Sequence, residues 1–147
     1  MLVRDVMSSP VITLRPDVPV RAAAALLVSH GFTGAPVVDG EHRMIGMATE
    51  ADLVRGMIVP DDRDVGEPPE PTVGQVMTPS VTAMSPEADL ADVVALMLDD
   101  GIRSVPIMED GRLVGVVSAR DALRVVANRE LTSKDVRRRR GVRSAER

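Results

Sequence analysis

Two short motifs carry side chains that could bind a sugar phosphate. Thr49 and Asp52 form a Thr-x-x-Asp pattern, and Ser118 and Asp121 repeat it as Ser-x-x-Asp. A carboxylate can accept hydrogen bonds from two hydroxyl groups of one ribose, and a helix N-terminus presents free N–H groups and positive potential to a phosphate. The same pattern also favours a helix capping box, with the hydroxyl as N-cap and the acid as third helical residue. One hydroxyl can serve both roles, so both interpretations stay open.

Other residue types exclude several kinds of chemistry. The chain has no cysteine, which excludes a disulfide-stapled domain, a thiolate metal site and a cysteine nucleophile. His30 and His42 are explained by a helix end and a turn, so no metal site is expected. Without Trp or Tyr there is no stacking platform for single-stranded nucleic acid. No catalytic motif is visible, and we expect a protein that is not an enzyme.

The two motifs belong to an internal repeat. Residues 3–54 match residues 73–123 with one single-residue gap, so the offset is 70 and then 69. The shared positions include Gly31 with Gly101 and Pro36 with Pro106. Glycine and proline mark specific backbone conformations, and chance seldom aligns them at a fixed offset. The sequence therefore predicts two copies of one structural unit.

Each copy predicts the element order β-α-β-β-α. In the first copy an extended segment at 11–14 precedes helix-start residues at 16–19 and a helix that ends at Gly31. A hairpin with a turn at Asp39–Gly40 follows, and a second helix begins at Thr49. The second copy repeats this order, starting from an extended segment at 81–84 and with a turn at Asp110–Gly111.

Four regions are expected along the 147 residues: a first repeat at 1–58, an acidic Pro-rich linker at 59–72, a second repeat at 73–130 and a basic tail at 131–147. The net charge of −4 divides into about +5 in the tail and about −9 elsewhere. The acidic body disfavours nonspecific nucleic-acid binding. The tail is either a frayed helical extension or disordered.

The chain shows no secretory signal pattern and no run of about 18 apolar residues. We therefore expect a cytoplasmic protein with no membrane partner. Lys134 is the single lysine, and the abundance of Arg, Ala, Val and Asp suggests a GC-rich, bacterial genome.

The doubled pattern resembles a pair of cystathionine β-synthase (CBS) domains, the tandem unit called a Bateman module. Three pairs of stretches carry the resemblance: Val6-Met7-Ser8 with Val76-Met77-Thr78, GFTGAPVVD with GIRSVPIMED, and residues 46–52 with residues 115–121. It implies a mixed α/β (α+β) fold, in which two β-α-β-β-α repeats pack through their sheets into a pseudo-twofold disc. The two clefts of such a disc commonly bind adenosine-containing ligands.

By this resemblance the protein is a regulatory sensor of AMP, ADP, ATP or S-adenosylmethionine that acts on another, unidentified protein. Two discs often associate, so a homodimer is expected, formed through the helix faces around 26–27 and 96–98. Two alternatives stay open. The chain could bind nucleic acid weakly through Arg137–Arg140 in the tail, or it could be a structural dimerisation module with empty clefts.

The resemblance also assigns the site residues. Asp52 and Asp121 take ribose hydroxyls, and Thr49 and Ser118 lie near the phosphate. Positions that contact phosphate in the family hold Arg103 and Arg120 in the second copy, but Thr33 and Ala51 in the first. One cleft then combines Thr49 and Asp52 with both arginines. The other places Ser118 and Asp121 opposite Thr33 and Ala51 and lacks these cations.

The adenine ring would need an apolar slot. The resemblance offers Phe32 and Ile102 for it, together with Thr13 or Ile12 and with Thr82. The alternative is that these side chains are ordinary core, and for Ile12 we prefer that alternative. An isolated surface arginine is likewise usually only solvated, and this is the alternative for Arg103 and Arg120.

Overall fold

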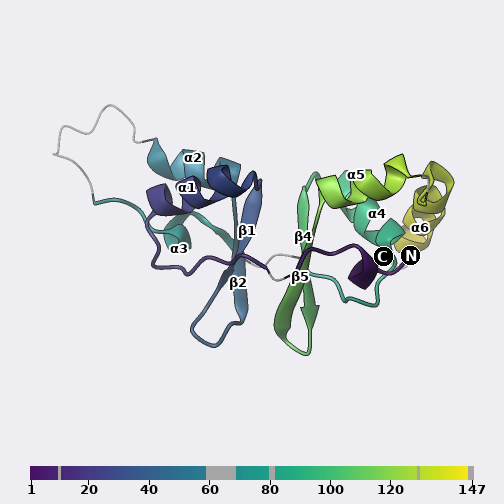
Figure 1. The fold of residues 1–147 in the computed structure, drawn as a ribbon, viewed down its shortest axis with the longest axis horizontal. Coiled ribbons are helices and arrows are strands. Elements are labelled where there is room, and N and C mark those ends of the chain that lie inside the picture. Colours follow the sequence, from purple (N-terminus) through teal and green to yellow (C-terminus); the bar gives the residue numbers. More distant parts are fainter. Residues whose placement is uncertain (10, 59–68, 80–81, 129, 146–147) are drawn as a thin grey trace. The chain divides into compact units, whose positions relative to one another are not determined.

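The structure is a computed structural model that describes residues 1–9, 11–58, 69–79, 82–128 and 130–145 (Figure 1). The chain forms two compact units, one made of Ile12–Val81 and the other of Met1–Val11 with Thr82–Arg147. These units do not coincide with the two sequence repeats. Each repeat gives its first segment to the unit that holds the rest of the other repeat. The region boundaries drawn from the sequence stay a prediction.

The unit of residues 12–81 contains a three-stranded antiparallel sheet in the order β1-β2-β3. Leu14 adds a parallel bridge to Val37 on the outer side of β1. Helix α2 packs against α1, α3 and β2. The elements of this unit are α1 (Val20–His30), β1 (Gly34–Val38), β2 (Met44–Thr49), α2 (Glu50–Met57), α3 (Val73–Val76) and β3 (Thr78–Pro79).

The apolar spacing of α1 explains its packing. Val20, Ala23 and Leu27 recur at intervals of three and four residues, and all three are buried. They join Val37 and Leu53 in the core of this unit. The helix ends as predicted, because Gly31 adopts a left-handed conformation with φ of 67°.

The other unit repeats this plan around a two-stranded antiparallel sheet, β4-β5. Met84 makes a parallel bridge to Ile107, and Ser8 makes an antiparallel bridge to Val116, where β3 lies in the first unit. The elements are the 3-10 helix η1 (Val3–Asp5), α4 (Leu90–Asp100), β4 (Ser104–Glu109), β5 (Arg112–Ser118), α5 (Ala119–Ala127) and α6 (Ser133–Ala145). Figure 1 shows α4, α5 and α6 gathered beside this hairpin.

The predicted mixture of helices and strands is confirmed, with three differences of detail. The extended segments contribute single bridges at Leu14 and Met84 rather than strands, while Val81 lies outside the described residues. Helices η1 and α3 were not predicted, because each is too short to show a period. In the first hairpin, where a turn at Asp39–Gly40 was predicted, the left-handed residue is His42, with φ of 63°.

The basic tail forms helix α6, which packs against α4. Leu131 and Val136 are buried in the core of this unit. Arg139 donates two hydrogen bonds to Asp92, of 2.8 and 2.6 Å, and Arg140 pairs with Asp99. Of the two expectations for the tail, the helical extension is therefore what the structure has up to residue 145.

The end of the predicted linker contacts α1, while its residues 59–68 lie outside the described residues. The backbone N–H of Val20 donates to the Pro71 carbonyl at 3.0 Å, and that of Arg21 donates to Glu70 Oε1 at 3.1 Å. Residues 70–72 thus belong to the unit of residues 12–81 and contact its helix α1. Among the described helices, none is long and apolar enough to cross a bilayer.

Candidate functional site

Asp52 is the centre of a hydrogen-bonded cluster at the start of α2. Its side chain is 2% exposed, and its Oδ2 accepts from the backbone N–H of Thr49 at 3.0 Å. Thr49 Oγ1 in turn accepts from the backbone N–H of Asp52 at 3.3 Å, which completes a capping box. Arg55, one turn further along the helix, donates to Oδ1. The capping interpretation of this motif is therefore correct, and a buried acceptor lies beside a helix N-terminus.

Asp121 forms the equivalent cluster at the start of α5. It is 4% exposed, and its Oδ2 accepts from the Ser118 backbone N–H at 2.9 Å. Ser118 Oγ accepts from the Asp121 N–H at 3.1 Å, so this capping box is also complete. Arg124 donates to Asp121 Oδ1 at 3.4 Å. The two copies of the motif thus have the same local geometry.

A hydroxyl from a distant segment also reaches each acid, and the sequence interpretation missed both. Thr78 Oγ1 lies 3.3 Å from each carboxylate oxygen of Asp52, and Ser8 Oγ lies 3.3 Å from Asp121 Oδ2. Ser8 and Thr78 are 70 residues apart, so they occupy the same position of the repeat. That offset was the available signal. It identified the residues as repeated but did not show which acid they contact.

Glycines in β2 and β5 let these segments come close. A Cβ atom on Gly46 would lie 2.8 Å from Met77 Sδ and 2.8 Å from the Thr78 carbonyl oxygen. A Cβ atom on Gly115 would lie 2.5 Å from Met7 Sδ. Each glycine therefore makes room for the residues that lead into the hydroxyl contact, which explains why it recurs at the repeat offset.

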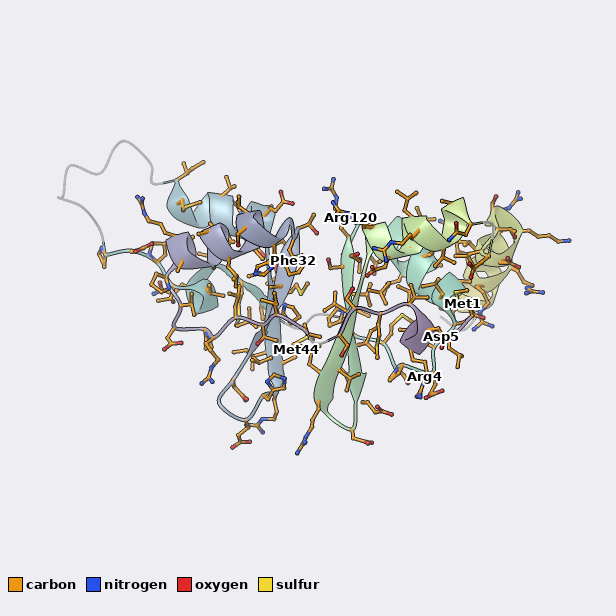
Figure 2. All side chains as sticks on the ribbon, viewed as in Figure 1. Met1, Arg4, Asp5, Phe32, Met44 and Arg120 are labelled. Atoms are coloured by element: carbon orange, nitrogen blue, oxygen red, sulfur yellow. The ribbon has the colours of Figure 1, made fainter. Side chains whose placement is uncertain are left out.

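The predicted phosphate-contact positions lie next to the helix starts in each unit. The Thr33 carbonyl accepts from the Glu50 N–H at 2.9 Å, and the Arg103 carbonyl accepts from the Ala119 N–H at 2.7 Å. Thr33 is half-buried, whereas Arg103 is exposed. Arg120 is also exposed, at the start of α5 (Figure 2). The exposed arginines therefore lie in the same unit as Ser118 and Asp121.

Thr49 and Asp52, with which those arginines are expected to share a cleft, belong to the other unit. The structure brings Thr33 together with Thr49 and Asp52, and Arg103 with Ser118 and Asp121. The grouping across the two repeats, including the asymmetry between the clefts, stays a prediction.

The residues proposed for the adenine slot lie partly at the surface. Phe32 is 41% exposed and stacks on His30 with ring centroids 5.3 Å apart (Figure 2). Ile102 is half-buried against the core of its unit. Thr13 is half-buried, next to the bridge from Leu14 to β1. Phe32 and Thr13 belong to the first unit, and Ile102 belongs to the second.

The described part of the chain contains no group of three His, Asp or Glu side chains that could hold a metal ion. The two clusters offer carboxylate acceptors, the positive potential of a helix N-terminus and nearby cations. This arrangement suits binding of a polyhydroxylated anion.

Comparison with known proteins agrees with this architecture. The family model described as "CBS domain" matches residues 3–59 and 73–128. The CBS domain-containing protein YhcV of Bacillus subtilis is 32% identical over 119 residues, which cover 81% of each chain. Protein MJ1225 of Methanocaldococcus jannaschii is 29% identical over 126 residues, 86% of this chain but 43% of that protein. The chain thus spans less than half of that archaeal relative.

Solved structures also share this fold. The CBS domain pair of protein MJ0100, in complex with 5′-methylthioadenosine and S-adenosyl-L-methionine, gives a TM-score of 0.75 at 25% identity and covers 88% of this chain and 98% of that one. The structure of CBSX2 in complex with AMP gives 0.71 at 26% identity, with coverage of 88% and 98%. The family match, at the residues that form the two repeats, shows that the chain belongs to the CBS domain family as a tandem pair.

Proposed function

We propose that the chain is a non-enzymatic regulatory module that binds adenosine-containing ligands through Asp52 and Asp121. The observation that carries the proposal is the twinned cluster, in which a buried carboxylate lies at a helix N-terminus in both repeats. A carboxylate can accept a ribose diol, and the positive potential of a helix N-terminus favours a phosphate. Two CBS pairs of the same fold, those of MJ0100 and CBSX2, were crystallised with adenosine compounds.

The two sites differ in charge in this proposal. Arg103 and Arg120 bind the phosphate of a nucleotide whose ribose contacts Asp52, while the site at Asp121 has Thr33 and Ala51 at the matching positions. The first site then prefers AMP, ADP or ATP, and the second prefers a ligand without a strong anion, such as S-adenosylmethionine. The exposure of both arginines supports this proposal, since their guanidinium groups are accessible to a ligand.

A thermal-shift screen of adenosine, AMP, ADP, ATP and S-adenosylmethionine tests the proposal. A ligand that binds only the native state stabilises it by about 2.7 kcal/mol at a hundredfold excess over Kd. Arg103→Ala should then weaken AMP binding about ten- to a hundredfold and leave adenosine nearly unchanged, because only AMP carries the phosphate. No shift with any of the five compounds would refute adenosine binding.

We also propose a homodimer, through a surface that shares only Leu98 with the helix faces expected from the sequence. Of those faces, Leu27, Leu96 and Met97 are buried within their own units, Leu26 is half-buried and Leu98 is exposed. Equivalent positions of both repeats instead expose apolar side chains on helices. The pairs are Val28 with Leu98, Val54 with Leu123, and Met57 with Val126, with exposed fractions of 81% and 61%, 51% and 66%, and 44% and 45%.

Exposed apolar side chains on the helices suit a symmetric dimer, because the same residues of each protomer can then contact their copies in the other. Light scattering at micromolar concentration should give a dimer mass for the wild type and a monomer mass for Leu123→Glu. A monomeric wild type would contradict the proposal. The output of such a module would be a partner protein or a further domain that responds to the bound ligand.

A further inference from the structure

The two hydroxyls that reach the buried acids have no part in the proposed function so far. Ser8 and Thr78 lie on exposed residues, yet each hydroxyl donates to a carboxylate that is 4% or 2% exposed. A hydroxyl donating to a carboxylate is also the contact that a ribose would make. We infer that Thr78 and Ser8 compete with the ribose of the ligand for Asp52 and Asp121, and thereby set the ligand affinity. This inference rests on the proposed function.

The count of donors shows why there is competition. A carboxylate offers about four lone-pair positions. Asp52 accepts from the Thr49 N–H, from Arg55 and from Thr78, and Thr78 lies 3.3 Å from both of its oxygens. A ribose diol brings two further donors. Two further donors would bring the total to five, more than the four positions of the carboxylate, so one of the three present donors must leave.

The hydroxyl is better able to leave than the capping N–H groups, and at Asp121 the Arg124 contact, of 3.4 Å, is about as long as that of Ser8. The capping N–H groups belong to the ends of β2 and β5, whose pairing holds them in place. The hydroxyl contacts measure 3.3 Å, which is longer than the usual 2.7–2.8 Å of such bonds. Because Ser8 and Thr78 are exposed, their hydroxyls can turn to water after displacement. A ribose hydroxyl would replace a long bond by a bond of the same kind.

The competition links the site to chain segments of the other repeat. Ser8 exchanges two backbone hydrogen bonds with Val116, of 2.9 and 3.2 Å, and Thr78 in β3 pairs with Met47 in β2. When the ligand takes the carboxylate, each segment loses the side-chain bond that helps to hold it on the strand. By thermodynamic reciprocity, a segment held more weakly gives tighter ligand binding. Ligand binding is thereby coupled to how firmly the exchanged first segment of each repeat is held on its strand.

Calorimetric titration of adenosine into Thr78→Val and Ser8→Ala tests the inference, with Ser9→Ala as the control for loss of a neighbouring exposed hydroxyl. Loss of one net hydrogen bond corresponds to an affinity change of about two- to tenfold. Both variants should bind adenosine about two- to tenfold more tightly than the wild type, and Ser9→Ala should bind like the wild type. The gain should be smaller with 2′-deoxyadenosine, which lacks one of the competing hydroxyls.

A second measurement uses the wild type alone, so it does not depend on how well a variant folds. Saturating adenosine should speed hydrogen exchange at the amides of Ser8 and Val116, because the ligand releases the Ser8 side chain. Unchanged or weaker adenosine binding by both variants, or slower exchange at these amides, would overturn the competition while leaving the proposed function intact. If the wild type and both variants bind no adenosine compound, the proposed function fails as well.

Discussion

Replacement of Gly46 by alanine tests whether the segment of Met77 and Thr78 must lie directly against β2. The added Cβ would lie 2.8 Å from Met77 Sδ and 2.8 Å from the Thr78 carbonyl oxygen. The methionine side chain can turn away, but the carbonyl can move only if the pairing of β2 with β3 shifts. Overpacking of this kind costs about 1–3 kcal/mol. For a chain of this length that corresponds to a melting temperature about 3–10 °C lower.

Differential scanning calorimetry of Gly46→Ala measures this change, and Gly141→Ala is its control. Gly141 lies in α6, and a Cβ there would meet nothing within 4 Å. Alanine is favoured over glycine in a helix by up to about 1 kcal/mol, so the control should melt at the same or a higher temperature. One degree corresponds to about 0.3 kcal/mol for a chain of this length. A Gly46→Ala protein that melts within one degree of the wild type would therefore refute the close approach.

Three further changes are expected. Thr49→Ala and Ser118→Ala each remove an N-cap hydroxyl and should lower the free energy of unfolding by about 1 kcal/mol in urea titrations; no loss in either would contradict the capping boxes. Leu131→Ala should cost about 2 kcal/mol, because Leu131 is 5% exposed in the core beneath α6, and a wild-type midpoint would show that α6 is not docked. The Thr132 hydroxyl and N–H hold the pKa of Asp135 below its usual range. The ionised carboxylate therefore stabilises the start of α6 above the unfolded pKa of about 3.9, and this stabilisation is lost as the pH falls through the lower folded pKa. Circular dichroism from pH 5 to pH 2 should show a loss of helical signal in the wild type and a smaller loss in Asp135→Asn.

Local chemistry explains how much of the fold could be predicted from the sequence. Gly31 and Gly101 mark the ends of α1 and α4, and the Thr-x-x-Asp pattern marks the start of α2, because these signals act within one turn of a helix. The family resemblance then supplied the tandem architecture, which the match to CBS domains confirms.

The partners of the acids could not be predicted in the same way. Ser8 and Asp121 are 113 residues apart, and the contact exists because the first segment of one repeat joins the other repeat's unit. No local pattern encodes that exchange. The docking of α6 was hidden for a similar reason, since Arg139 belongs to the run of arginines considered for nucleic-acid binding, while its partner Asp92 lies on α4.

The central claim is that Asp52 and Asp121 bind the ribose of an adenosine compound as well as capping helices. Calorimetric titration of adenosine into Asp52→Asn and Asp121→Asn tests it most directly, with Asp135→Asn as a matched control, because Asp135 bonds Thr132 in the same pattern at the start of α6. A hydrogen bond to a charged group contributes about 1.5–3 kcal/mol, so the site variants should lose about ten- to a hundredfold in affinity at the altered site. The control should bind like the wild type. Equal affinities in all four proteins would contradict the claim and leave both acids as caps alone.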